Sequence, residues 1–437
     1  MLASGTSANP LPQDVQAALA RAKVPREAVV MVVHEIGARA PRLDWRSDQA
    51  ANPASLMKLY TTLAALDTLG PAWTWNTPVW IEGTVDAGVL DGSLIIKGSG
   101  DPKLVQERLW LLLRRVMQGG VREIRGDIVL DRSAFSLPEA DPGDFDGEPL
   151  RPYNVLPDAL LLNYKSLAFT FTPDPARGVA TVVVEPPVAG LQVSTSVPLS
   201  YGSCDDFRRS LAADFGNPLR PRFEGEYPAA CGERVWSVAH GEPRAFNARM
   251  IEGLWREMGG TLGGSVREGS APSVQPSFEV VSPTLGEVVR EINKFSNRVL
   301  GPHLLPPLGR TQRGAGSLPA ARAALAGWLG QRLGSSAHGI VIDNGSGLSR
   351  EARSTGRALA ALLQYAWTSP AMPDFIASLP AAGTPDADHP GVRVVNYFFC
   401  WAAIYQLGIA WHGALLRRRV LVAMAAVATV TLLEATG

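Results

Sequence analysis

The feature that most constrains this chain is the stretch at residues 52–66, where an Asn-Pro dipeptide precedes a long apolar run. Proline disfavours the helical conformation of the residue before it, so we expect a helix to begin just after Pro53. Ser55 and Lys58 stand three positions apart. Residues at this spacing share one face of a helix. The sequence therefore predicts a serine hydroxyl beside a lysine amine at the start of an apolar helix.

This Ser-x-x-Lys pair has a catalytic and a structural interpretation. A serine hydroxyl becomes a strong nucleophile when a base takes its proton, and a lysine is such a base when burial or a nearby cation keeps its amine neutral. Alternatively, Ser55 caps the helix and Lys58 lies in solvent. No second Ser-x-x-Lys occurs in the sequence. Both residue types are common, so the surrounding sequence has to decide.

Composition excludes several other functions. The 437 residues predict two or three domains, and 41 basic residues balance 41 acidic ones without a basic block. We therefore expect no nucleic-acid partner. The six histidines are scattered, without the His-Glu-x-x-His spacing of a zinc enzyme, so we expect no metal or cofactor. No Gly-x-Ser-x-Gly motif of an α/β-hydrolase is present in the sequence.

Hydrophobic periodicity divides the chain into a strand-rich block between two helix-rich parts, which is typical of an α+β protein with an insertion. The expected segments are helices at 14–23, 104–119, 283–295, 320–334 and 354–366, and strands at 28–34, 79–83, 91–98, 126–131, 180–185 and 339–343. The strand at 28–34 is expected to be buried. The turn at 98–102 resembles a phosphate-binding loop only superficially, and we interpret it as structural.

Two of the three cysteines are candidates for a disulfide. Cys204 and Cys231 lie in a turn-rich region and either pair in an oxidising compartment or stay as two buried thiols. Cys400 has no evident partner.

Seven stretches in order resemble one protein family, the S13 D-alanyl-D-alanine carboxypeptidases and endopeptidases of the class C low-molecular-mass penicillin-binding proteins. The resemblance extends from about Val29 to Thr384. The stretches are Asn-Pro-Ala-Ser-Leu-Met-Lys at 52–58, Gly-Ser-Gly-Asp-Pro at 98–102, Gly-Asp-Ile-Val-Leu-Asp at 126–131, Leu-Leu-Leu-Asn-Tyr at 160–164, Ile-Asn-Lys-Phe-Ser-Asn at 292–297, Asp-Asn-Gly-Ser-Gly-Leu-Ser-Arg at 343–350 and Ser-Leu-Pro-Ala-Ala-Gly at 378–383.

The resemblance implies a transpeptidase-like catalytic domain, an antiparallel sheet flanked by helices, made from residues 1–75 and 271–384, with strand-rich domains inserted at 76–270. It implies that Ser55 attacks a D-Ala-D-Ala peptide of peptidoglycan, that Lys58 takes its proton and that β-lactams acylate the same serine. Ser296 matches the serine of a second, Ser-x-Asn motif, which relays a proton to the leaving amine. The backbone N–H of Ser55 would form part of an oxyanion hole.

The chain departs from the family pattern in two places. The third residue of the second motif is Arg298 instead of asparagine, with Asn297 before it, and we expect both to line the substrate site. A cation there would favour the neutral form of Lys58, although Arg298 could equally point to solvent. The family also uses a Lys-Thr-Gly strand to hold the substrate carboxylate. This sequence has no Lys-Thr-Gly, and no lysine follows Lys294.

The tail at 385–437 differs from the family. It contains apolar runs at 394–411 and 420–433, separated by Arg417, Arg418 and Arg419. It is either a membrane-associated segment or a sequence read out of the ancestral frame. Residues 1–7 lack the charged and apolar regions of a secretory signal, so no export signal is visible, whereas the resemblance implies a periplasmic protein.

Two hypotheses follow. The protein is an active serine DD-peptidase in which another cation, such as Arg393 or one of the three tail arginines, replaces the missing lysine. Otherwise it is a degenerate relative that at most binds wall peptides.

Overall fold

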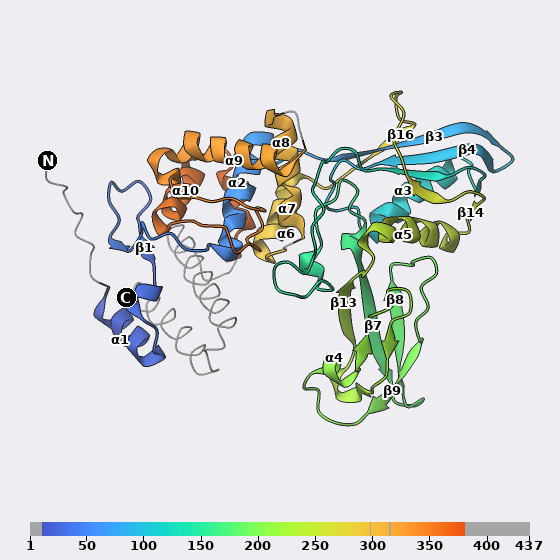
Figure 1. The fold of residues 1–437 in the computed structure, drawn as a ribbon, viewed down its shortest axis with the longest axis horizontal. Helices are drawn as coiled ribbons and strands as arrows, with labels where there is room; N and C mark the ends of the chain where they lie inside the picture. Colours follow the sequence, from blue (N-terminus) through green and yellow to red (C-terminus); the bar gives the residue numbers. More distant parts are fainter. Residues whose placement is uncertain (1–10, 298, 314–315, 381–437) are drawn as a thin grey trace.

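The computed structural model describes residues 11–297, 299–313 and 316–380 (Figure 1). The helices are α1 Gln13–Ala22, α2 Met57–Leu69, α3 Gln106–Gln118, α4 Phe207–Ser210, α5 Pro243–Glu257, α6 Leu285–Lys294, α7 Leu300–His303, α8 Leu305–Arg313, α9 Leu318–Leu333, α10 Gly356–Thr368 and α11 Met372–Ser378. The strands are β1 Met31–Val33, β2 Leu43–Trp45, β3 Asn76–Asp86, β4 Val89–Lys97, β5 Glu123–Ile124, β6 Ile128–Asp131, β7 Ser166–Asp174, β8 Val179–Glu185, β9 Ser196–Ser200, β10 Ala213–Asp214, β11 Arg222–Phe223, β12 Tyr227–Pro228, β13 Arg234–Ala239, β14 Thr261–Leu262, β15 Val266–Glu268 and β16 Phe278–Val281.

Two large hydrophobic cores divide these elements. One core takes its buried side chains from between Leu56 and Trp75 and again from between Leu285 and Leu379, so it joins segments far apart in the chain. The other lies wholly between Val79 and Phe278. Figure 1 shows the corresponding regions next to each other, the first built of helices and the second mainly of strands. The protein is thus of the α+β class, as expected.

Helix α2 is the centre of the helical region. Every residue from Met57 to Leu66 is buried, because the helix is apolar all round and is enclosed by α6, α8, α9 and α11. Helix α6 is amphipathic and begins with a capping box between Thr284 and Glu287. These contacts hold the start of α2 and the end of α6 in fixed positions.

Two predicted strands of the helical region differ in the structure. The expected buried strand at 28–34 contains only β1, which is half-buried and pairs antiparallel with β2, because a 3₁₀ turn occupies Arg26–Ala28. The expected strand at 339–343 is a single bridge between Val341 and Arg353. An apolar run shows that a segment can be buried, but the available partner decides where a strand ends. The resemblance implies an antiparallel sheet in the catalytic domain. Within the described residues of the helical region, β1 and β2 are the only strands of such a sheet.

The strand-rich region contains a seven-stranded and a five-stranded sheet. The seven-stranded sheet has the order β14-β5-β4-β3-β16, with β6 between β4 and β15, and its core includes apolar residues of α3 and α5. The five-stranded sheet has the order β12-β9-β8-β7-β13 and extends away from the helical region (Figure 1).

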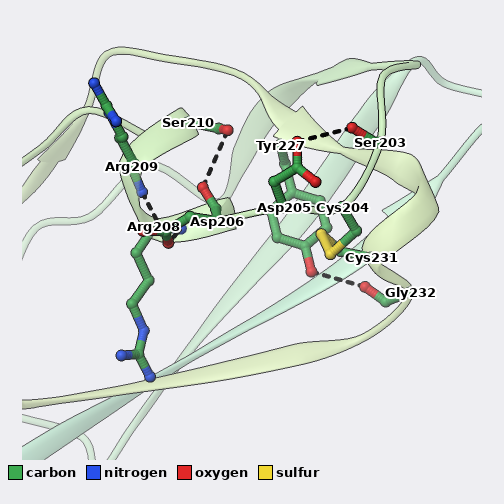
Figure 2. Close-up of a disulfide and its surroundings, with 10 residues drawn as sticks. All are labelled: Ser203, Cys204, Asp205, Asp206, Arg208, Arg209, Ser210, Tyr227, Cys231 and Gly232. Atoms are coloured by element: carbon green, nitrogen blue, oxygen red, sulfur yellow. Dashed lines mark hydrogen bonds between the residues drawn. A yellow bond between two sulfur atoms is a disulfide. The ribbon is translucent and has the colours of Figure 1, made fainter. Parts of the chain in front are cut away.

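The disulfide between Cys204 and Cys231 is present and lies beside the five-stranded sheet (Figure 2). It joins the segment before α4 to the segment after β12, with 4.9 Å between the two Cα atoms. The same end of the sheet contains packed aromatic rings, among them Phe171 stacked on Tyr227. The prediction of a disulfide is therefore confirmed over that of two buried thiols.

The turn at 98–102 is structural, as predicted. Gly98 touches the backbone of Ala159 so closely that a Cβ atom would overlap it. Gly100 has a φ of 87° and donates its N–H to the carbonyl of Ala159. This glycine turn therefore serves close packing of two chain segments.

In the part of the chain that the structure describes, no helix has the length and apolar character needed to cross a membrane.

Candidate active site

The structure brings Ser55, Lys58 and Ser296 together. The Nζ atom of Lys58 donates to the Oγ atom of Ser55 at 3.0 Å and to the Oγ atom of Ser296 at 3.4 Å. The hydroxyl of Ser296 donates to that of Ser55 at 3.3 Å. Ser55 and Lys58 thus meet a residue that lies 241 and 238 positions later in the chain. The 3.0 Å contact lies within the usual range for proton transfer, and the two longer contacts are typical of active sites without substrate.

A tight turn before α2 holds Ser55 in place. Ser55 lies in a 3₁₀ turn, Ala54–Leu56, that runs directly into α2. The side chain of Asn52 accepts the N–H of Ala54 and donates to the carbonyl of Ser349 at 2.6 Å. The Asn-Pro dipeptide therefore starts the helix by fixing the loop in front of it, while Ser55 itself caps nothing.

Lys58 is buried, with 1% of its surface exposed. The structural interpretation of the pair required a solvated lysine, so the burial of Lys58 favours the catalytic interpretation.

Ser296 and Asn297 follow the end of α6. Ser296 has a φ of 50°, in the left-handed region that serine seldom adopts, and this turns its side chain towards Ser55. The side-chain oxygen of Asn297 accepts the N–H groups of Val299 and Leu300 and so caps the start of α7. Arg298, the other expected substrate-binding residue, lies outside the described residues.

The glycine-rich turn at 344–349 lies directly against Ala54 and Ser55. The sequence alone did not predict that this turn belongs to the site. Gly347 has a φ of 84°, and a Cβ atom there would overlap the carbonyl oxygen of Ala54 and lie 2.8 Å from the nitrogen of Ser55. Gly301 of α7 approaches Ser346 and the Cε atom of Lys58. Two features of the sequence could have indicated this position. They are the glycine spacing of the turn and the place of the turn among the seven stretches that match the family.

A buried histidine connects this site to the strand-rich region. His303 of α7 donates from Nδ1 to the carbonyl of Val299, and its Nε2 accepts the N–H of Asp158 at 3.1 Å. Burial, the largest cause, lowers the pKa of His303 to about 4, so the ring is neutral at pH 7. The loop that carries Ser296 is thereby fastened to a segment of the insertion.

Asp158 is in turn the centre of an ion cluster. Its carboxylate lies 2.5 Å from Nζ of Lys165 and 2.8 Å from Nη2 of Arg132. Burial alone would raise the pKa of Asp158, but the two cations hold it below its usual value. The contact of His303 with Asp158 was not predicted, because no local pattern relates residues 145 positions apart. The ion cluster was not predicted either.

Comparisons with known proteins agree with this geometry. A D-alanyl-D-alanine carboxypeptidase of Actinomadura sp. (strain R39) is 30% identical over 353 residues, which cover 76% of this chain and 63% of that enzyme. A short segment of 83 residues, 19% of this chain, is 39% identical to 17% of the carboxypeptidase DacB of Haemophilus influenzae. This chain therefore spans less than two thirds of the length of either relative.

The fold comparison gives a similar result. The crystal structure of penicillin-binding protein 4 (DacB) of Haemophilus influenzae superposes with a TM-score of 0.63 at 22% identity, covering 80% of this chain and 78% of that one. It supports the transpeptidase-like fold with insertions.

The sequence pattern of the D-Ala-D-Ala carboxypeptidase 3 (S13) family matches residues 11–392. The match passes Thr384, where the resemblance was expected to end, and includes all three residues of the catalytic cluster. This chain belongs to the D-Ala-D-Ala carboxypeptidase 3 (S13) family.

Proposed function

We propose that this protein is a serine D-Ala-D-Ala carboxypeptidase or endopeptidase that acts on peptidoglycan stem peptides and cross-links. One observation carries the proposal: a half-buried serine hydroxyl lies 3.0 Å from the amine of a buried lysine, and both contact a second serine from a distant segment.

The reaction begins with proton transfer from Ser55 to the neutral amine of Lys58. The Oγ atom of Ser55 then forms a bond to the carbonyl carbon of the penultimate D-alanine, and the carbonyl becomes an oxyanion. The backbone N–H of Ser55 stabilises this oxyanion. Gly347 leaves the space around that nitrogen that a side chain would occupy.

Collapse of the tetrahedral intermediate breaks the C–N bond and leaves an ester on Ser55. Ser296 passes the proton held by Lys58 to the departing amine, which its contacts with both groups allow. Water then adds to the ester, with the same groups taking its proton, and the free carboxylate leaves. A β-lactam follows the first half of this path, because opening its ring produces the same ester.

Substrate binding falls in this proposal to Asn297, Arg298 and a cation that replaces the missing lysine. Arg393, Arg417, Arg418 and Arg419 are the other candidates for binding the substrate carboxylate, and they lie outside the described residues.

We also propose that residues 1–75 and 271–384 form the catalytic domain, that 76–270 form inserted domains, and that the tail at 385–437 is separate from both. The two hydrophobic cores support this division except at the boundary after residue 270, because β16 and its buried Phe278 belong to the core and the sheet of the strand-rich region. A periplasmic location is supported by the disulfide, since such bonds persist in oxidising compartments.

A fluorescent penicillin and a D-Ala-D-Ala peptide test the function together. The folded full-length protein is expected to become labelled and to release D-alanine, and Ser55→Ala is expected to lose both properties while keeping the wild-type melting temperature. Folded wild-type protein that is neither labelled nor active would overturn the proposal in favour of a degenerate relative that at most binds wall peptides.

A further inference from the structure

Apart from the candidate active site, a cavity lies where the helical and strand-rich regions meet. Its volume is about 470 Å³, within the usual range for sites that hold small molecules. The lining comes from four places: the connection between α2 and β3 with the start of β3, the end of β4 with the turn after it, the segment after β6, and helix α8. None of the catalytic residues lines it.

The lining combines aromatic faces with positive charge. Trp73 and Phe135 are half-buried aromatic residues, and Lys97 and Arg310 are the two cations. Lys97 lies 3.6 Å from Asp131, whose carboxylate also accepts two backbone N–H groups, whereas no ion pair engages Arg310 within the described residues. No acidic side chain is among the described residues of the lining. The cavity therefore favours an anion that also has a flat apolar face.

The cavity lies at the opposite end of α2 from Ser55. Trp73 follows the last residue of α2, and Ser55 precedes the first. The helix has 13 residues and is therefore about 20 Å long. A ligand in the cavity would leave the catalytic cluster free, so the cavity is an accessory site.

We propose that this cavity binds the glycan part of peptidoglycan, at a muramyl residue whose lactyl carboxylate carries no stem peptide. A sugar ring would stack on Trp73. The lactyl carboxylate would lie between Lys97 and Arg310. The choice of polymer rests on the proposed function; the anionic saccharide chemistry rests on the lining alone.

Calorimetric titration of the full-length protein with the peptide-free disaccharide of N-acetylglucosamine and N-acetylmuramic acid tests the site. We expect one bound disaccharide per chain, and binding about fivefold weaker in Arg310→Gln. Arg313→Gln is the matched control, since it removes the same charge from the same helix outside the cavity, and it is expected to bind as the wild type does. Chitobiose, which has similar rings without the carboxylate, is expected to bind at least fivefold more weakly.

Absence of binding at millimolar disaccharide, equal binding by Arg310→Gln, or equal binding of chitobiose would overturn the proposal. Preferential binding of a free stem peptide would also overturn it. The titration is repeated in Ser55→Ala, so that the two proposals fail separately. If the disaccharide binds but penicillin does not label the protein, the proposed enzyme activity is wrong and the proposed saccharide site stands. If penicillin labels the protein but the disaccharide does not bind, only the saccharide site is wrong.

Discussion

The two buried polar clusters of this protein treat charge in opposite ways. Around Asp158, a buried carboxylate is paired with Lys165 and Arg132, and every group is held by an opposite charge. Around Lys58, a buried amine contacts the hydroxyls of Ser55 and Ser296, groups that can exchange a proton with it. The first arrangement pairs opposite charges, whereas the second is the one to which we assign the proposed reaction. His303 connects them, since it joins the backbone of Asp158 to the loop that carries Ser296.

Removal of the amine from the catalytic cluster should have the largest effect on acylation. We expect Lys58→Met to lower the rate of acylation by penicillin by about 10²- to 10⁴-fold, the usual contribution of a general base. Lys103→Met is the control, because Lys103 binds Glu291 and Tyr164 away from Ser55. Stopped-flow or gel-based labelling measures both rates. Equal loss in the two variants would mean that Lys58 acts only through the fold.

A methyl group added at Gly347, next to Ser55, should have the next largest effect on the rate of acylation. We expect Gly347→Ala to slow acylation about tenfold, because its Cβ atom would overlap the carbonyl of Ala54. Gly334→Ala is matched to it, since Gly334 also has a positive φ but nothing lies within 4 Å of its Cβ position. Both variants should lose about 1–3 kcal/mol of unfolding free energy from the positive φ, and Gly347→Ala should lose more, because its Cβ atom would also overlap the backbone. Only Gly347→Ala should lose acylation, and similar rates would remove the turn at 344–349 from the account.

Substitution in the ion cluster around Asp158 should lower the free energy of unfolding more than it lowers the rate of acylation. Asp158→Asn leaves Lys165 and Arg132 without their carboxylate, and breaking a buried pair typically costs about 3–5 kcal/mol. Asp127→Asn breaks a surface pair with Arg267 and should cost at most about 1 kcal/mol. Urea denaturation measures both changes. A loss of acylation in folded Asp158→Asn as large as that in Lys58→Met would contradict the division between the clusters.

Two buried groups should give small and opposite pH effects. Burial raises the pKa of Asp101 to about 6, so its contribution is present at pH 4 and is lost as the pH rises through 6. Burial lowers the pKa of His303 from 6.5 to about 4, so its contribution is present above pH 6.5 and is lost as the pH falls towards 4. In the wild type the two partly cancel.

Substitution should separate these effects. Relative to the wild type, Asp101→Asn should lose stability more steeply as the pH falls from 6.5 to 4, and His303→Gln less steeply. Unfolding free energies measured at several pH values give the three profiles. Parallel profiles would show that neither group titrates in that window.

Local patterns predicted much of this structure. The apolar run after Pro53 predicted α2 and the Ser55–Lys58 pair, and the spacing of Cys204 and Cys231 in a turn-rich region suggested their disulfide. The helices α3, α6, α9 and α10 lie close to their expected ranges. Each of these features depends on residues near one another in the sequence, where helix periodicity and turn chemistry act.

Contacts between distant segments could not be predicted in this way. The capping of α7 by Asn297 was not predicted, because the four residues of this helix are too few to show a period. The role of Asn297 in substrate binding stays a prediction. The pairing of His303 with Asp158 depends on how the insertion packs on the helical region. Ser296 was predicted as a site residue only from the resemblance to a family, because nothing in its own segment indicates that Ser55 is a neighbour.

The most direct test of the central claim is mass spectrometry of the folded full-length protein after incubation with penicillin G, followed by peptide mapping. The account predicts one covalent adduct with the mass of the whole drug, located on Ser55 and absent from Ser55→Ala. An adduct on another residue, or folded protein of unchanged mass, would contradict the claim that Ser55, Lys58 and Ser296 form a reactive centre.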